Sequence, residues 1–591
     1  MNYTLKTTEQ KPKKEETLSN ALGKIVPLLA GEQKNIIIAF IAIFINSASN
    51  LIGPVIIAYT VDTFIQEKNF SGVLLFSALL LGIYALGMVA SYVQTISMGG
   101  VGRRVLFKLR NALFTKIQEL PIAFFNENKV GDLISRINND TDKLNQFFSH
   151  ALMQFFGNFF LILGSGILLL NLHFQLGVAA LLPALLVLII SQIISAWVKR
   201  RNVKSLQSLG SLTAEIQESL ENFKVIVAFN RQDYFRKKFH DANETNYSAS
   251  LSAGIASNVF IPLYGLASNL AQIIVLAFGI YLISTGNFTI GLLIGFLLYV
   301  NNFYTPLRQL ASVWSSFQLA LAALDRISEI LSFMPDITVI SGEKAEKRES
   351  ELIMEFKDVS FGYPSKAGEK VLQNINLELK KGAIYAFVGP TGGGKTTMTL
   401  LMSRLYDPTE GIIFLDGKDL RSYEPSERTK KIGFILQEPF LFTGTVQENI
   451  LYGNTEYLAF SDEELEKTLA NSHLSKLLLR FDEGLKTPIT ANGNTTSLGQ
   501  KQLIAFMRAI LREPEILILD EATANIDTVT EQLLEEILNT LPKETTKIII
   551  AHRLNTISSA DQVYFVNGGG ITLAGSLQSA VEMLMHGERK S

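Results

Sequence analysis

The chain has 591 residues, 48% of them hydrophobic, and a mean hydropathy of +0.24. A composition this apolar is unusual for a soluble protein and predicts a membrane portion, and the length predicts several domains. The formal net charge of −2 gives no support for nucleic-acid binding, and the lack of cysteine excludes disulfides, thiol catalysis and cysteine-based metal sites.

The sequence begins with a polar stretch that includes Lys11, Lys13 and Lys14. This stretch lacks the apolar core of a cleavable signal peptide. We expect residues 1–20 to form a cytosolic, partly disordered N-terminal tail.

Six apolar runs follow, each about 20 residues long, which is the length that crosses a bilayer. We expect a membrane domain of six helices over residues 21–333. The runs cover approximately residues 35–59, 72–98, 150–171, 174–198, 260–283 and 288–304. Buried helices of a large soluble protein are the alternative, and the near absence of charge in all six runs argues against it.

Basic residues are distributed unevenly between the connections. Lys68 is the only Lys or Arg in the connections after the first, third and fifth runs. The connections after the second and fourth runs are rich in them: Arg103, Arg104, Lys108, Arg110, Lys116, Lys129, Arg136, Lys199, Arg200, Arg201, Lys204, Arg231 and Arg236. Because cytosolic loops carry the excess of Lys and Arg, we expect these connections and both termini in the cytosol, at the cytoplasmic membrane.

Both basic connections keep a helical spacing of apolar residues, over residues 99–149 and 199–258. We therefore expect membrane helices that continue into the cytosol, short crosspieces at residues 121–131 and 222–230, and returning helices. Solvated hairpins without a function are the alternative. We favour a coupling role, because connections of this length are costly without a docking partner.

A polar linker over residues 334–351 leads to a second domain, residues 352–591, in which short β-like runs alternate with helical ones. Its main motif is Gly389–Thr396, which fits the phosphate-binding pattern G-x-x-x-x-G-K-[ST] between a strand and a helix. Lys395 should reach the β- and γ-phosphates, and Thr396 should bind Mg²⁺. Backbone N–H groups of the loop would cradle the phosphates. The remaining members of this cradle are Pro390, Thr391, Gly392, Gly393, Gly394 and Thr397.

A second motif, Ile516–Glu521, reads as a buried strand that ends in two carboxylates. Asp520 is placed to hold Mg²⁺, and Glu521 is placed to polarise the attacking water. A chance match to the phosphate-binding pattern is the alternative, and this second motif argues against it. The two motifs together predict a nucleotide triphosphatase that uses ATP and Mg²⁺.

Six spans followed by this ATPase domain resemble a half-transporter of the ABC exporter family, of the bacterial multidrug and lipid type. The resemblance runs from about residue 20 to about residue 575, and residues 120–136 resemble the family's first coupling region. The fold that it implies is an all-α membrane domain of six transmembrane helices with long cytosolic extensions. An α/β P-loop ATPase domain with a small β subdomain follows.

The resemblance also implies roles for single residues of the second domain. Tyr363 resembles the aromatic residue that stacks on adenine, and Gln437 the glutamine that contacts Mg²⁺ or the attacking water. Asp527 resembles the D-loop aspartate, and His552 the switch histidine at the γ-phosphate. Each residue alone would more often be structural, and it is their order after the phosphate-binding motif that supports these roles. The implied catalytic residues are Glu521, His552, Lys395 and Gln437.

The chain departs from the family at the signature L-S-G-G-Q, which corresponds to Thr496–Gln500. Ser497, Gly499 and Gln500 remain, whereas Leu498 brings a bulky side chain to the place of a glycine. The acidic residue expected upstream is Ala491. In the family, ATP lies between two such domains packed head to tail. We therefore favour one subunit of a heterodimer of half-transporters over a homodimer that tolerates the variant signature.

The implied function is ATP-driven export, or outward flipping, across the cytoplasmic membrane by alternating access. The spans contain amides and aromatics, and we find no ionisable residue deep within them, which favours a hydrophobic or amphipathic small molecule, lipid or peptide. The alternative is an ATP-gated or ATP-regulated membrane protein without coupled transport. Glu521 and His552 argue against it, because a module that only binds ATP needs no poised base.

Overall fold

The computed structural model describes residues 3–5, 30–334, 339–340, 351–364, 368–437, 439–490, 496–520, 528–550 and 560–586. The chain forms two compact units. The helical unit contains residues 9–116 and 131–332, and the mixed unit contains residues 1–8, 117–130 and 333–591. The mixed unit therefore includes residues 117–130, which the sequence places between two apolar runs.

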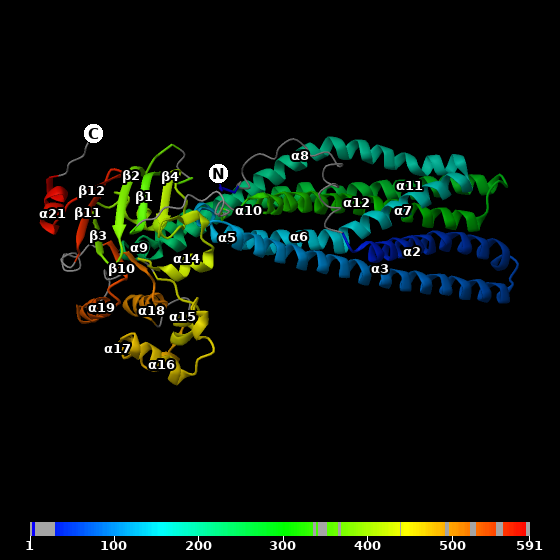
Figure 1. Cartoon of the computed structure of the whole chain (residues 1–591). Coiled ribbons are helices and arrows are strands. Elements are labelled where there is room, and N and C mark those ends of the chain that lie inside the picture. Colours follow the sequence, from blue (N-terminus) through cyan, green and yellow to red (C-terminus); the bar gives the residue numbers. More distant parts are fainter. Residues whose placement is uncertain are drawn as a thin grey trace. The chain divides into compact units, whose positions relative to one another are not determined.

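The helical unit is built from long helices joined by short turns and π-helical segments (Figure 1). Within the described residues, six stretches are long and apolar enough to cross a membrane, as predicted. The elements are α2 (Gln33–Thr60), η2 (Val61–Ile65), α3 (Phe70–Glu119), α5 (Val130–Ser135), η3 (Arg136–Asp140), α6 (Thr141–Gln146), η4 (Phe147–Ala151), α7 (Leu152–Leu172), α8 (Phe174–Glu221), α9 (Phe223–Ala228), α10 (Gln232–Asn258), α11 (Phe260–Ser284) and α12 (Ile290–Ser332).

Helices α3 and α8 are much longer than a bilayer requires. Helix α3 has 50 residues and α8 has 48, so each is about 70–75 Å long at 1.5 Å per residue, against about 30 Å of hydrocarbon. Helix α3 ends at Glu119, before Pro121, and α8 ends at Glu221, before Asn222. The continuous extensions and both breaks agree with the sequence prediction.

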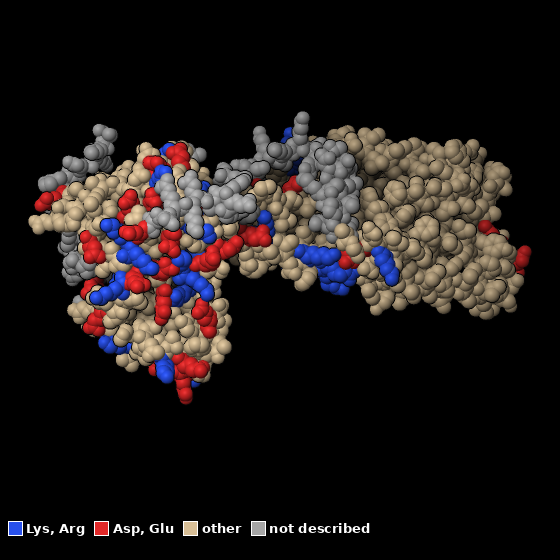
Figure 2. All heavy atoms as spheres, viewed as in Figure 1, with Lys and Arg blue, Asp and Glu red and all other residues tan. Residues whose placement is uncertain are grey.

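Tyrosine hydroxyls connect the packed helices of this unit. Helix α12 packs on α2, α7 and α11, and α8 packs on α10 and α11. The buried Tyr299 donates to the carbonyl of Leu51 at 2.5 Å, and Tyr304 donates to the carbonyl of Ala180 at 2.9 Å. Buried tyrosines need such partners for their hydroxyls. On the face shown in Figure 2, a long band of the helical unit is free of charged side chains among the described residues.

Charged side chains join η3 to the end of α12. Arg136 is 1% exposed, and its guanidinium donates to Asp132 at 3.0 Å and to Glu329 at 2.8 Å. Asp140 lies four residues after Arg136 in η3, and Arg326 of α12 donates hydrogen bonds to both of its carboxylate oxygens. Each of these ion pairs has one buried member, Arg136 or Asp140, and the pairs with Glu329 and Arg326 hold η3 against the end of α12.

The mixed unit contains two main sheets. The antiparallel sheet has the order β2-β1-β4-β5, and the larger sheet has the order β12-β11-β3-β10-β9-β6, in which all strands but β12 are parallel to their neighbours. The strands are β1 (Leu352–Phe361), β2 (Leu372–Lys380), β3 (Ile384–Val388), β4 (Glu410–Leu415), β5 (Lys418–Asp419), β6 (Ile432–Ile435), β7 (Gly444–Thr445), β8 (Pro488–Ile489), β9 (Ile516–Asp520), β10 (Thr546–Ile550), β11 (Gln562–Asn567) and β12 (Gly570–Leu573). The predicted α/β domain with a small β subdomain is confirmed.

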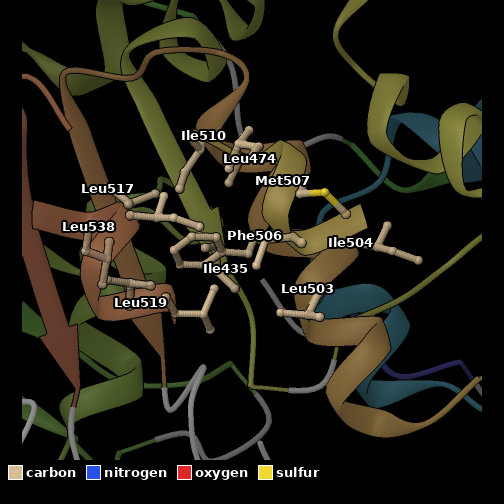
Figure 3. Packing of buried hydrophobic residues seen from close by; sticks show 14 of the residues in the cluster. Ile435, Leu474, Leu503, Ile504, Phe506, Met507, Ile510, Leu517, Leu519 and Leu538 are labelled. Carbon is tan, nitrogen blue, oxygen red and sulfur yellow. The ribbon is translucent and has the colours of Figure 1, made fainter. Parts of the chain in front are cut away.

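Helices and short 3₁₀ turns surround these sheets. They are α4 (Ile122–Glu127), α13 (Lys395–Met402), η5 (Leu420–Ser422), α14 (Pro425–Lys431), α15 (Val446–Leu451), η6 (Thr455–Tyr457), α16 (Asp462–Asn471), α17 (Ser475–Leu478), η7 (Gly484–Lys486), α18 (Leu498–Ile510), α19 (Thr528–Thr540) and α21 (Leu577–His586). Figure 3 shows Phe506 and Ile510 of α18 packed in one apolar cluster with Leu517 and Leu519 of β9. The helix that begins at the variant signature is thus anchored on the central sheet.

Candidate functional site

The predicted site residues gather at one edge of the larger sheet. Strands β3, β10, β9 and β6 are parallel neighbours, so their carboxyl ends lie at the same edge. The glycine-rich loop follows β3, Asp520 is the last residue of β9, and Gln437 comes two residues after β6. The carboxyl edge of a parallel sheet is where ligands bind in open α/β folds. The structure therefore brings the loop, Asp520 and Gln437 to one edge of this sheet.

The loop packs directly on the backbone of β11, which explains two of its glycines. A Cβ atom added to Gly389 would lie 2.0 Å from the carbonyl oxygen of Val566, and one added to Gly393 would lie 2.6 Å from it. Gly389 also has a φ of +150°, which side chains disfavour. Any larger residue at these two positions would push the loop away from the sheet.

Lys395 is the first residue of α13 and lies folded over the loop. It is 6% exposed, and its Nζ donates to the carbonyl of Gly389 at 2.8 Å and to that of Pro390 at 3.1 Å. The helix runs from Lys395 to Met402, so Lys395 lies at its N-terminus. The first backbone N–H groups of α13 and the ammonium group of Lys395 therefore create a positive electrostatic potential at the loop. Such a potential favours the binding of an anion such as a phosphate.

Tyr363 comes from the other sheet but contacts the helix of the loop. Its hydroxyl lies 2.9 Å from Oγ1 of Thr397, so the two residues that the sequence assigned to adenine and phosphate are hydrogen-bonded. Its ring packs edge-on against Phe361 and Tyr406, with centroids 5.0 and 5.4 Å away. Tyr406, which was not predicted from the sequence, is 7% exposed, and burial raises the pKa of its hydroxyl. No motif marks it, because its partners come from distant parts of the chain.

The variant signature forms the start of α18. Ser497 is its N-cap: Ser497 Oγ accepts from the N–H of Gln500 at 3.2 Å, and Gln500 Oε1 accepts from the N–H of Ser497 at 3.0 Å. This reciprocal pair is a capping box, which satisfies two N–H groups at the helix start. Leu498 is the first helical residue and is 41% exposed. The replaced glycine position therefore presents an apolar side chain on the surface, beside a well-capped helix N-terminus.

Several predicted site residues lie outside the described part of the chain. Asp520 is described and is 2% exposed at the end of β9. Glu521, Asp527, His552 and Ala491 belong to segments that the structure does not describe. The geometry of the candidate site therefore rests on the glycine-rich loop, Tyr363, Gln437, Asp520 and α18.

Comparisons with known proteins agree with this architecture. Residues 36–307 match the family model of the ABC transporter transmembrane region, and residues 372–524 match that of the ABC transporter. An uncharacterized ABC transporter ATP-binding protein of Bacillus subtilis is 33% identical over 96% of this chain and 93% of its own length. A fatty acid ABC transporter ATP-binding/permease protein of Mycobacterium bovis is 31% identical, over 86% of this chain and 80% of the relative. A multidrug resistance ABC transporter ATP-binding and permease protein of Lactococcus lactis is 30% identical, over 91% and 90%.

Proposed function

The chain belongs to the ABC transporter family, as a half-transporter whose membrane and ATP-hydrolysing domains share one polypeptide, and from this premise we propose that it exports, or flips outward, a hydrophobic or amphipathic substrate across the cytoplasmic membrane. Half-transporters of this class bind ATP and work as dimers in a membrane. The cytosolic location of both termini and alternating access are parts of this proposal. They rest on the uneven distribution of basic residues and on the long helical connections.

The polar contacts inside the apolar spans carry the proposal on the substrate. Gln272 Nε2 donates to Asn301 Oδ1 at 3.0 Å, and Asn302 Nδ2 donates to the carbonyl of Asn50 at 3.1 Å. These groups are neutral amides, whereas a charged cargo would need an ionised partner in a medium of low dielectric constant. One relative is named as a fatty acid transporter and another as a multidrug resistance transporter, and both names support an apolar or amphipathic cargo for this chain.

We assign the chemistry of ATP hydrolysis to the residues at the sheet edge. Tyr363 would stack on adenine, and Thr396, Asp520 and Gln437 would hold Mg²⁺. Hydroxyl, carboxylate and amide oxygens are the ligands that Mg²⁺ prefers. Glu521 would polarise the attacking water, while Lys395 and His552 would stabilise the charge on the transferred phosphate. Ser497, Gly499, Gln500 and Asp527 would complete the site of the opposite subunit.

We further propose that the chain pairs with a different half-transporter. The surface that would meet the partner's nucleotide carries Leu498, and an exposed leucine cannot offer the close backbone approach that glycine allows. One of the two sites in such a dimer would then hydrolyse ATP slowly. The partner would supply the intact signature that faces this chain's Lys395.

The first experiment measures the ATPase activity and the oligomeric state of the full chain, purified alone in lipid nanodiscs. A heterodimer subunit alone is expected to hydrolyse little ATP and to gain activity when it is purified with its partner half-transporter. A stable dimer of this chain with robust hydrolysis would overturn the heterodimer and favour a homodimer. In the active complex, Glu521→Gln should lower hydrolysis by roughly 100-fold or more while ATP still binds. Normal turnover in that variant would contradict the role of Glu521.

Transport is tested in proteoliposomes, with fluorescent fatty-acyl lipid as the probe. The proposal expects ATP-dependent movement of the probe across the bilayer that stops in the Glu521→Gln variant. Hydrolysis by the wild-type complex with no movement of this lipid or of a hydrophobic cationic dye would overturn the proposed substrate class. Movement that persists in Glu521→Gln with ATP bound would instead favour the ATP-gated alternative.

A further inference from the structure

Three residues near the start of the sequence are held in the mixed unit. Tyr3 is 0% exposed and Leu5 is 4% exposed, within the stretch of residues 1–20 for which the sequence predicted a cytosolic, partly disordered tail. They lie against residues 121–128, which we call the coupling segment because it includes α4 and corresponds to the break after α3. Residues 3–5 and the coupling segment belong to the same compact unit.

The side-chain amide of Asn128 both accepts a hydrogen bond from the backbone of residues 3–5 and donates one to it, as the backbone of a neighbouring β-strand would. Asn128 Oδ1 accepts from the N–H of Leu5 at 2.9 Å, and Asn128 Nδ2 donates to the carbonyl of Tyr3 at 2.9 Å. The same Nδ2 donates to the carbonyl of Phe124, and the N–H of Tyr3 donates to Glu127 Oε2 at 3.0 Å. The side chains of Glu127 and Asn128, at the end of α4, thus bind backbone groups of Tyr3 and Leu5.

The ring of Tyr3 connects the coupling segment to the residues that follow α12. Its centroid lies 5.7 Å from that of Phe333, and Phe333 lies 5.7 Å from Phe124 of α4. Its hydroxyl donates to the carbonyl of Met334 at 3.4 Å. Residues 3–5 therefore act as a strap across two segments that are about 200 residues apart in the sequence.

The other side of the coupling segment contacts the candidate ATP site. Asn126 Nδ2 donates to the hydroxyl of Tyr406 at 2.9 Å. The ring of Tyr406 lies at 90° to that of Tyr363, and Tyr363 in turn is hydrogen-bonded to Thr397. A continuous series of contacts within one unit thus leads from the strap, through Asn126 and Tyr406, to the ring proposed to stack on adenine.

We propose that Tyr3–Leu5 form a strap that holds the coupling segment so that Asn126 fixes Tyr406, which makes Tyr406 a positioning residue for Tyr363. The proposal rests on the proposed role of Tyr363 and predicts an effect on the base of ATP, not on its phosphates. When the strap is removed, Asn126 and Tyr406 lose their fixed orientation. Tyr363 must then become ordered as the nucleotide binds, which weakens the affinity for ATP.

The test measures binding to the full chain in nanodiscs, so it does not depend on hydrolysis, transport or the partner. Removal of residues 1–8 is expected to raise the Kd for MgATP about three- to tenfold. The Kd for inorganic tripolyphosphate, which has no base, should stay within twofold. Tyr406→Phe should have the same selective effect, because it keeps the ring and removes the hydroxyl that Asn126 binds.

A combined variant separates a strap from a general loss of stability. Removal of residues 1–8 together with Tyr406→Phe should raise the Kd for MgATP no further than either change alone, because both act on one contact series. A peptide of residues 1–8 (Met-Asn-Tyr-Thr-Leu-Lys-Thr-Thr) added to the shortened protein should restore tight ATP binding. The same peptide with Tyr3→Ala should not, because it lacks the ring that contacts Phe333.

Three results would overturn the strap. They are an unchanged Kd for MgATP after removal of residues 1–8, an equal loss of affinity for ATP and tripolyphosphate, and additive effects of the deletion and Tyr406→Phe. These outcomes are distinct from a failure of the proposed transport function. The function fails if hydrolysis or lipid movement does not depend on Glu521, whatever the strap does.

Discussion

Arg326 of α12 and Asp140 of η3 form a bidentate ion pair, with Nε 2.6 Å from Oδ2 and Nη2 2.5 Å from Oδ1. The Asp140 side chain is 3% exposed, so loss of Arg326 would leave a buried carboxylate with the single contact to Lys143, at 3.0 Å, in place of a bidentate partner. We expect Arg326→Ala to lower the free energy of unfolding by about 3 kcal/mol. Thermal unfolding of the protein in nanodiscs measures the loss.

The chain offers a matched control for this ion pair. Arg236 and Asp233 also form an ion pair, at 3.2 Å, but their side chains are 79% and 97% exposed. Arg236→Ala should leave the unfolding temperature unchanged, because solvent screens exposed pairs. Joint replacement of Arg326 and Asp140 by Met and Leu should cost less than Arg326→Ala alone. Equal losses at both ion pairs would contradict the importance of burial.

Tyr363 should act through its ring more than through its hydroxyl. Stacking of a base on an aromatic ring contributes about 1–3 kcal/mol, so Tyr363→Ala should weaken ATP binding about tenfold or more. Tyr363→Phe removes the hydrogen bond to Thr397 but keeps the ring, so its Kd for ATP should stay within about threefold of the wild-type value. Calorimetric titration with ATP distinguishes the two variants. A larger loss in Tyr363→Phe than in Tyr363→Ala would exclude stacking on the base.

The contact of Gly389 with β11 predicts a loss of stability without nucleotide. Gly389→Ala would place a Cβ 2.0 Å from the carbonyl oxygen of Val566, and we expect it to destabilise the nucleotide-free protein by about 2–4 kcal/mol. Gly392→Ala is the control, because its φ is +82° but nothing lies within 4 Å of its Cβ position. Gly392→Ala should lower the free energy of unfolding by only about 1 kcal/mol. Similar unfolding temperatures for the two variants would contradict the packing of the loop.

The contact of Glu32 with Arg104, at the start of α2, should make the stability of the folded protein depend on pH. Hydrogen bonds from Arg104, at 2.8 and 2.7 Å, lower the pKa of this carboxyl from 4.5 to about 2. Because the folded-state pKa is lowered, the stabilisation is present above pH 4.5 and is lost as the pH falls towards 2. The difference in unfolding temperature between the wild type and Glu32→Gln should be constant from pH 8 to 6 and shrink below about pH 4.5. A difference that changes between pH 6 and 8 would point to another group.

The sequence predicted the parts of the fold that depend on local patterns. Apolar runs of bilayer length gave the six spans, and Pro121 and Asn222 marked the ends of α3 and α8. The glycine-rich pattern located the loop after β3, because its glycines are required by the loop's own backbone and by β11. The alternation of β-like and helical runs was also predicted, but the pairing of β1 with β4 was not, because pairing partners leave no local pattern.

The contacts that the sequence did not predict join residues far apart in the chain. Tyr406 contacts Asn126 across 280 positions, and Tyr3 contacts Asn128 across 125. Single polar or aromatic residues carry no periodicity, so their partners can be found only when the chain has folded. The capping box at Ser497 and Gln500 could have been predicted, since S-x-x-Q before an apolar run is a helix-start pattern.

The division of the mixed unit among three separate stretches also concerns how the protein is made. Residues 3–5 and the coupling segment leave the ribosome long before residues 333–591. Four membrane runs are synthesised after the coupling segment and before its partners in residues 333–591. Phe124, which is fully buried in the finished protein, is exposed during that interval unless another molecule covers it. A fragment that starts at residue 352 would lack the coupling segment, so its Tyr406 hydroxyl would face water instead of Asn126.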